Sequence, residues 1–139
     1  MHRTAEFTLS LPGDEAMALF TPEGERQWAD GWDPQYPDPS RREGPGAVFT
    51  TAHGDHDTTW IMVDQRPDSV RYARVVHGMN AGTVTVEGIS AGEGSTRIRV
   101  TYDLTHLSSA GQDRLRAFEA DYETEIAAWA SEIAAALSR

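Results

Sequence analysis

Apolar and polar side chains alternate at the start of the chain. Between Arg3 and Leu11, apolar residues occupy the odd positions from Ala5 onward, and threonine, glutamate or serine occupies the even ones. This period of two is typical of a strand with one buried face. The pair Pro12-Gly13 predicts the end of the strand.

Two short helices are predicted next. Residues 14–20 carry apolar side chains at helical spacing, which indicates a first helix. Thr21 and Pro22 then have the pattern of an N-cap residue followed by proline at the first helical position. We expect this second helix to reach Trp28 or Ala29.

A long irregular loop follows the helices. The segment from Asp30 to Gly46 contains four prolines and three glycines, which exclude regular structure. A loop of this length is uncommon within a compact domain and often serves as a lid. It contains Trp32 and Tyr36, for which core packing and ligand contact are both open, and we expect the two rings to border the mouth of a cavity.

Five further strands are predicted between the loop and residue 104. Their ranges are Ala47–Ala52, Thr58–Val63, Val70–Val76, Thr83–Ile89 and Thr96–Leu104. The turns between them are short, which favours an antiparallel meander. In the last strand Ile98, Tyr102 and His106 share the parity of the face expected to be buried. Around Trp60 both faces are partly apolar, and we assign Trp60 and Met62 to the inner face on size alone.

The last segment predicts one long amphipathic helix. Ser109 and Gln112 form a capping-box pattern after Ser108, and no proline or glycine interrupts the chain between Gln112 and Leu137. Apolar residues recur every three or four positions, at Leu115, Phe118, Tyr122, Ile126, Trp129, Ile133 and Leu137. At 1.5 Å per residue such a helix would be about 40 Å long. A helix of that length needs a concave sheet surface to bury its stripe.

Composition narrows the possible partners. The 139 residues fit one domain, and the absence of cysteine excludes a disulfide framework and thiolate chemistry. The formal net charge of -10 argues against binding to nucleic acid or an anionic membrane surface. The apolar runs are too short for membrane insertion or a secretory signal. We expect a cytoplasmic protein, either a monomer or a homodimer.

The order of elements and several motifs resemble the SRPBCC superfamily, also called START-like or pollen-allergen-like, and in particular its bacterial members. The motifs are Phe20–Arg26, Trp28, Gly31–Pro34, Thr59-Trp60, Thr101-Tyr102 and Trp129. The resemblance covers nearly the whole chain, residues 1–139. It implies an α+β helix-grip fold, in which a curved, six-stranded antiparallel sheet wraps around the C-terminal helix and leaves a cavity between them. Its members include lipid and steroid carriers, polyketide aromatases and cyclases, and chaperone activators, and they share no catalytic residues.

A set of aromatic, apolar and ionisable residues is predicted to contact a ligand. The set is Trp28, Trp32, Tyr36, Trp60, Met62, Tyr72, Arg74, Tyr102, Leu104, Phe118, Glu119 and Tyr122. Aromatic rings supply apolar area and tyrosine hydroxyls supply oriented polar contacts. Ordinary core packing is the alternative for these rings, and we favour it for Phe118 and Trp129.

Glu119 is the predicted ionisable group of the cavity. Its angle on the helical wheel lies close to that of Leu115, so it should face the sheet, with Arg74 or His106 as a possible partner. The alternative is a carboxylate at the edge of the stripe that reaches water. For an enzyme, the candidate proton-handling residues are Glu119, His106 and Tyr102, although a role for His106 within its turn is also open.

No metal or cofactor is predicted. The run from His53 to Asp57 contains nitrogen and oxygen ligands, but its place between two strands favours a solvated hairpin turn over a metal site. Three functions remain open. The first is binding or carriage of a small hydrophobic molecule, the second is a polyketide cyclase or dehydratase activity, and the third is a protein-interaction module resembling the chaperone activators.

Overall fold

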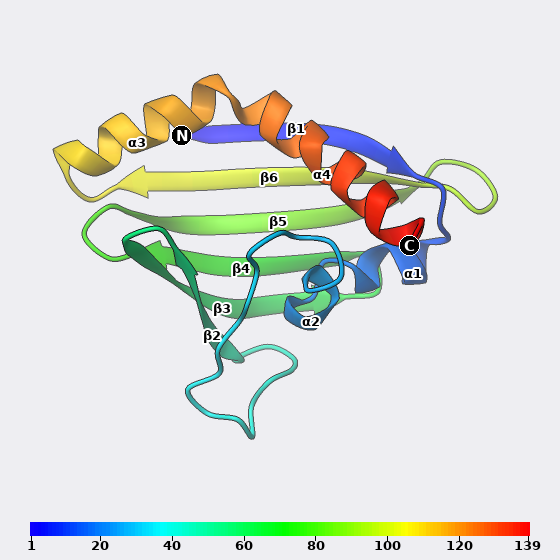
Figure 1. The fold of residues 1–139 in the computed structure, drawn as a ribbon, viewed down its shortest axis with the longest axis horizontal. Helices are drawn as coiled ribbons and strands as arrows, with labels where there is room; N and C mark the ends of the chain where they lie inside the picture. Colours follow the sequence, from blue (N-terminus) through cyan, green and yellow to red (C-terminus); the bar gives the residue numbers. More distant parts are fainter.

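Six antiparallel strands form a single sheet in the computed structural model, which describes residues 1–139 (Figure 1). They are β1 (His2–Leu9), β2 (Val48–His53), β3 (His56–Arg66), β4 (Ser69–Val76), β5 (Asn80–Ser90) and β6 (Thr96–His106). Their order in the sheet is β1-β6-β5-β4-β3-β2. The predicted meander is therefore confirmed, and β1 completes the sheet by pairing with β6.

Alternation along the strands determines which face is buried. In β6 the side chains of Ile98, Tyr102 and Leu104 are buried. In β3 Trp60 and Met62 are buried, which confirms their assignment to the inner face. The prediction for the end of β6 is wrong, because its last residue, His106, is exposed next to the turn that leads into α3.

Two short helices, α1 (Gly13–Ala18) and α2 (Pro22–Glu25), follow β1 as predicted. The Thr21 hydroxyl caps α2 by accepting a hydrogen bond from the Gly24 N–H at 3.0 Å. Gly24 also lets the two helices approach closely, since a Cβ at this position would lie 1.9 Å from the Ala18 carbonyl oxygen. The predicted extension of α2 to residue 28 or 29 is wrong, because turns replace the helix after Glu25.

The predicted C-terminal helix is two helices, α3 (Ser109–Ala120) and α4 (Tyr122–Leu137). They are separated by Asp121, whose φ of -102° and ψ of 7° depart from helical geometry. No glycine or proline stands near this residue, so the sequence carries no signal of the break. The break lets α3 lie over β5 and β6 while α4 follows β1, as a single straight helix could not on a curved sheet (Figure 1).

The N-cap of α3 lies one residue earlier than predicted. The Ser108 hydroxyl, not that of Ser109, accepts the hydrogen bond from the Gly111 N–H at 3.0 Å. Leu115, Tyr122 and Ile126 then bury the apolar stripe against the sheet, which confirms that the stripe packs on a single antiparallel sheet.

Residues 30–46 contain no helix or strand, in agreement with the sequence prediction. A single bridge between Gln35 and Thr50 ties this loop to β2. None of the helices is long and apolar enough to cross a lipid bilayer.

Candidate functional site

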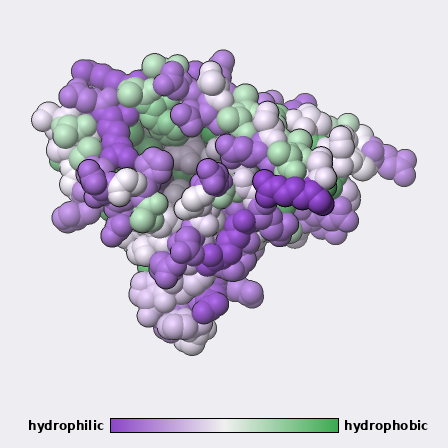
Figure 2. Space-filling model, in the orientation of Figure 1, coloured by the Kyte–Doolittle hydropathy of each residue, from purple (hydrophilic) through white to green (hydrophobic).

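A cavity of about 450 Å³ lies between the C-terminal helices, the inner face of the sheet and the segment that follows α2. Figure 2 shows a hollow on this face of the molecule, bordered by apolar and polar residues. The volume lies within the range of small-molecule sites.

Aromatic rings form much of the cavity wall. Trp32 comes from the loop, Trp60 and Tyr102 from the sheet, and Phe118 and Trp129 from α3 and α4. The rings of Trp32 and Trp60 meet edge to face with centroids 5.7 Å apart, and those of Tyr102 and Phe118 meet at 5.1 Å.

Two of the three indole N–H groups in this wall, those of Trp32 and Trp60, already have partners. Trp32 Nε1 donates to the Pro22 carbonyl oxygen at 2.8 Å, and Trp60 Nε1 donates to Thr51 Oγ1 at 3.0 Å. These bonds fix the orientation of both rings. What remains for a ligand is their apolar surface.

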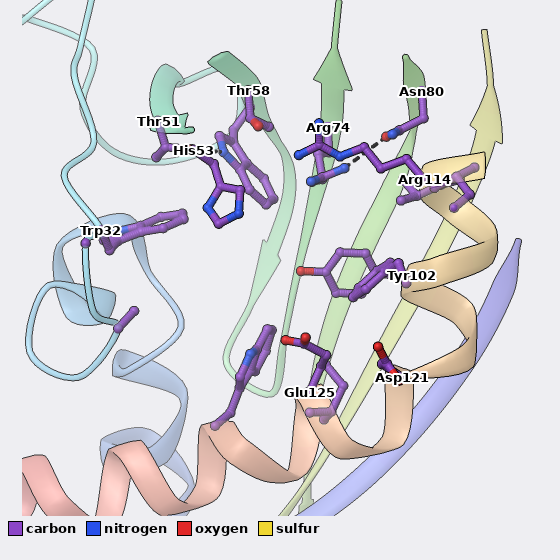
Figure 3. A pocket seen from close by; sticks show the side chains of 18 of the residues that line it. Trp32, Thr51, His53, Thr58, Arg74, Asn80, Tyr102, Arg114, Asp121 and Glu125 are labelled. Atoms are coloured by element: carbon purple, nitrogen blue, oxygen red, sulfur yellow. Dashed lines mark hydrogen bonds between the residues drawn. The ribbon is translucent and has the colours of Figure 1, made fainter. Parts of the chain in front are cut away.

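Arg74 occupies one end of the cavity. Its Nη1 donates to Asn80 Oδ1 at 2.9 Å, while its buried Nε has no hydrogen-bond partner (Figure 3). The guanidinium lies over the rings of Trp60 and Tyr102, at 5.5 and 6.0 Å from their centroids. Burial lowers the pKa of Arg74, and the charge of Arg114 acts in the same direction. The group nevertheless stays cationic at neutral pH.

Acidic groups lie at other positions in the wall. Asp121 and Glu125 come from the break between the helices and from α4, and Asp30 comes from the loop. Figure 3 shows the Glu125 carboxylate and the Tyr102 hydroxyl pointing toward the same part of the cavity. Burial raises the pKa of Tyr102 to about 12, so its hydroxyl is protonated at neutral pH.

The structure brings half of the predicted ligand residues together. Those that line the cavity are Trp32, Trp60, Arg74, Tyr102, Leu104 and Phe118. Tyr72 lines a smaller cavity beside it. Phe118 and Trp129, for which we favoured core packing, are half-buried, pack against the core and also line the cavity.

Other predicted residues are held in the core or the loop. Trp28 packs against Phe20 and Trp129 and donates its Nε1–H to the Leu19 carbonyl oxygen. Tyr122 is fully buried and donates to the Val100 carbonyl oxygen at 2.7 Å.

Two further predicted residues lie outside the cavity wall. Met62 is buried in the core. Tyr36 donates its hydroxyl to Glu23 Oε2 at 2.5 Å, and it is absent from the wall although Trp32 of the same loop belongs to it.

Glu119 does not line the cavity, which corrects its predicted direction. On α3 the cavity borders Arg114 and Phe118, on one side of buried Leu115, whereas Glu119 lies on the other side. There its backbone carbonyl accepts a hydrogen bond from Arg3 of β1. The helical wheel correctly identified the face of α3 that points toward the sheet. It could not show which of the two edges of that face borders the cavity.

Among the proposed catalytic residues, only Tyr102 lies in the cavity wall. His106 is exposed and does not line the cavity, although Asn80, its partner in the strand register, does. In the arrangement observed, neither His106 nor Glu119 belongs to the cavity wall.

The sequence interpretation missed the charged residues Arg114 and Glu125. A signal was present for both, because Glu125 precedes Trp129 and Arg114 precedes Phe118 by four positions, so each charged residue shares a helical edge with an aromatic residue of the wall.

The run from His53 to Asp57 forms the β2–β3 hairpin, with a turn at Gly54 and Asp55, as the sequence favoured. His53 lies at the rim of the cavity (Figure 3). No group of three or more histidine, aspartate or glutamate side chains is arranged to hold a metal ion.

Comparison with known proteins identifies the fold. No protein-family model and no curated protein matches the sequence. Among solved structures, the Zhui aromatase/cyclase from Streptomyces sp. R1128 superposes with a TM-score of 0.70 at 12% identity, covering 100% of this chain and 94% of that one. Norcoclaurine synthase from Thalictrum flavum gives 0.66 at 11% identity, over 94% and 88% of the two chains. An HSP90 activator from Plasmodium falciparum gives 0.62 at 16% identity, over 89% of each.

The chain has the helix-grip fold that these solved structures share, which is the fold implied by the SRPBCC resemblance. At these identities the similarity concerns the fold alone, and the SRPBCC fold supports several functions. The function must therefore be argued from the residues of the cavity.

Proposed function

We propose that this helix-grip domain binds a small molecule with a flat, largely apolar body and an anionic group, in the cavity between the sheet and helices α3 and α4. The observation that carries the proposal is Arg74, a cation in an aromatic wall with no acidic partner.

Arg74 differs from the other arginines of this chain because its Nε is buried without a hydrogen-bond partner. Arg26 and Arg99 form ion pairs with glutamates at 2.9 and 2.7 Å. Neither Arg74 nor Arg114 forms an ion pair, although the chain has 22 acidic residues. A buried cation with an unsatisfied N–H is costly unless another group completes its hydrogen bonds. A carboxylate or similar anion on the ligand would do so, because guanidinium binds such groups in a planar, bidentate geometry.

The rest of the wall favours a flat apolar body. Trp32, Trp60, Tyr102 and Phe118 present ring surfaces from three different parts of the chain. Aromatic rings prefer edge-to-face or offset stacking with another ring. An aromatic or polyketide-like ligand fits this wall better than a flexible alkyl chain.

The test uses two fluorescent probes that differ by one charge. 1-Anilinonaphthalene-8-sulfonate carries an anionic sulfonate, and N-phenyl-1-naphthylamine has the same ring system without it. Substitution of Arg74 by glutamine (R74Q) should weaken binding of the sulfonate about tenfold or more, which is the range for loss of a charge-assisted hydrogen bond. Affinity for the neutral probe should change by less than about twofold.

A matched control is available on the same strand. Arg71 is exposed on the opposite face of β4 and donates to Thr85 Oγ1. Its substitution by glutamine (R71Q) makes the same change in net charge, and it should leave both affinities unchanged. Equal losses in R74Q and R71Q would attribute the effect to long-range charge. Failure of both probes to bind the unaltered protein would contradict the proposed site.

A second candidate function is an enzyme of the polyketide cyclase or dehydratase type. It is favoured by the Tyr102 hydroxyl and Glu125 carboxylate, which point toward the same part of the cavity (Figure 3). Native mass spectrometry of the purified protein would identify a bound compound. Turnover of that compound, with loss of the rate but not of binding in Y102F, would favour the enzyme over the carrier.

The third candidate function, a protein-interaction module, receives less support. The large exposed apolar residues are Val48, Val63, Leu107 and Leu137, and they come from β2, β3, the β6–α3 turn and the end of α4. A docking surface for another protein usually requires a contiguous apolar patch. The cytoplasmic location and the monomeric or dimeric state stay predictions.

A further inference from the structure

A second, smaller cavity adjoins the first and contains a single ionisable carboxyl group. Its volume is about 20 Å³, which is enough for one water molecule or one ligand oxygen. The rings of Trp32, Trp60, Tyr102 and Trp129 border both cavities. We call the smaller one the inner chamber.

Glu25 is the only acidic or basic residue that lines the inner chamber. The other lining residues include Phe20, Phe49 and Tyr72, together with valines of β5. Glu25 is half-buried, and its carboxyl oxygens keep a little accessible surface, since they are not among the fully buried polar atoms that lack a partner. No side chain or backbone group forms a hydrogen bond with this carboxyl, and it forms no ion pair.

We propose that Glu25 binds a single polar atom of the ligand, a carbonyl or hydroxyl oxygen, that enters the inner chamber while the flat body of the ligand lies against the shared rings. The inference rests on the proposed function and adds a second polar contact, separate from Arg74. It also defines the ligand class more closely, as a flat ring system bearing an oxygen substituent.

The local structure holds Glu25 in this position. It is the last residue of α2, whose capped N-terminus and close contact with α1 at Gly24 fix its direction. Its backbone carbonyl accepts hydrogen bonds from Trp28 and Ala29. These contacts restrict the positions that the Glu25 carboxyl group can occupy.

The protonation state of Glu25 determines which ligand atoms it can bind. Burial raises the pKa of the Glu25 carboxyl to about 8, and no neighbouring cation offsets this. At pH 7 it is therefore mainly a neutral acid, which can donate its proton to a carbonyl oxygen. The facing groups are the hydroxyls of Tyr72 and Tyr102, whose pKa values are raised by burial and by the charge of Glu25. Both stay protonated where Glu25 ionises.

The main cavity also contains charged residues, and the experiment must separate their contribution to binding from that of Glu25. Arg74 and Glu125 line that cavity but not the inner chamber. A neutral pair of probes avoids both of them. Fluorene and 9-fluorenone have the same rigid ring system, and only fluorenone carries a carbonyl oxygen.

The experiment measures the affinity of the protein for fluorene and for 9-fluorenone by competition with N-phenyl-1-naphthylamine. At pH 6 we expect fluorenone to bind about fivefold to tenfold more tightly, the range for one hydrogen bond. This preference should fall as pH rises through about 8, because an ionised carboxylate cannot donate a proton.

Three variants test the assignment. Glu25→Gln keeps an N–H donor without a charge, so its preference for fluorenone should persist at pH 9. Glu25→Met removes the donor and should lose the preference at every pH. Glu23→Gln removes a carboxylate from the exposed side of the same helix and should behave as the unaltered protein does.

The possible results distinguish a failure of the Glu25 proposal from a failure of the proposed ligand site, on which it rests. Equal affinities for the two probes in the unaltered protein, or a preference that survives in Glu25→Met, would overturn the role of Glu25 alone. Failure of either probe to displace the neutral dye, together with failure of that dye to bind, would overturn the ligand site itself. If Glu25→Met does not fold, the pH dependence of the unaltered protein compared with Glu25→Gln still decides the question.

Discussion

At the scale of single residues, part of the cavity wall consists of tryptophan rings whose indole N–H groups are already bonded to the protein. Trp32 shows this arrangement. Its indole N–H is bonded to the Pro22 carbonyl oxygen, and its ring packs edge to face on Phe49 and Trp60. It lies in a loop without regular structure, yet these contacts hold its ring at the cavity wall.

Replacement of Trp32 by alanine should therefore weaken binding more than folding. We expect affinity for N-phenyl-1-naphthylamine to fall about tenfold, consistent with the loss of about 1–2 kcal/mol of stacking and apolar contact. The thermal midpoint should fall by only a few degrees, because Trp32 is half-buried. Fluorescence titration and thermal unfolding measure the two effects.

Two variants serve as comparisons for Trp32. Trp32→Phe keeps a ring and should bind with intermediate affinity. Tyr36→Phe removes the loop hydroxyl that contacts Glu23 and should leave probe binding unchanged. A large drop in thermal midpoint for Trp32→Ala, with unchanged affinity, would show that the ring belongs to the core and not to the site.

The sequence could identify much of the wall, including Arg74, but not its carboxyl groups. Trp60 and Tyr102 were recognisable because strand parity and size place them on the inner face. Glu25 was missed. The direction of a helix of four residues depends on tertiary contacts, which its sequence does not contain.

At the scale of elements, the join between β6 and α3 determines how the C-terminal helices lie on the sheet. Gly111 is in the first turn of α3 and packs on the connection between β4 and β5. A Cβ at this position would lie 1.8 Å from the Met79 carbonyl oxygen. The absence of a side chain at Gly111 thus allows α3 to approach the sheet closely.

Substitution of Gly111 by alanine should destabilise the protein. In an exposed helix this change usually stabilises, by about 1 kcal/mol. Here the contact with Met79 should reverse the sign and cost roughly 1–3 kcal/mol, as for overpacking in a core. Ser109→Ala, in the same turn but exposed and not the cap, should change the free energy of unfolding by less than about 0.5 kcal/mol. Urea unfolding of both variants measures the difference, and a stabilised Gly111→Ala would contradict the close approach.

The break at Asp121 explains why some element-scale predictions succeeded and others did not. Periodicity correctly gave the apolar stripe from Leu115 to Ile133, because both helices bury the same side, but Leu137 at its end is exposed. Periodicity could not give the break, since the curvature that requires it belongs to the sheet. Within α3 the helical wheel placed Glu119 close to Leu115, but the structure puts it on the edge of the stripe that lies away from the cavity.

At the scale of the whole molecule, the sheet and helices leave a cavity because they are joined mainly along β1 and β6. The loop and α2 close the opposite side with aromatic residues. This arrangement follows from the order of elements, so the sequence could predict it. The volume, the charged ends and the inner chamber depend on the packing of particular side chains, and these could not be predicted.

Stability should depend on pH in a way that reports the state of Glu25. Its pKa is raised from 4.5 to about 8 in the folded protein, so the folded state binds a proton that the unfolded state releases between these values. The stability gained from this proton is fully present below pH 4.5 and is lost as pH rises through about 8.

Glu25→Gln removes this titration and should therefore be more stable than the unaltered protein at alkaline pH. The difference should be small at pH 4 and should grow to a few kcal/mol by pH 9, on the order of 10 °C in thermal midpoint. Both proteins gain the same negative charge elsewhere as pH rises, so the difference between them isolates Glu25. Glu23→Gln should act in the opposite direction, because the Tyr36 hydroxyl lowers the pKa of Glu23 and its stabilising effect is lost as pH falls. A constant difference between Glu25→Gln and the unaltered protein from pH 4 to pH 9 would show that the carboxyl group is ionised as in water, and that the inner chamber does not hold a neutral acid.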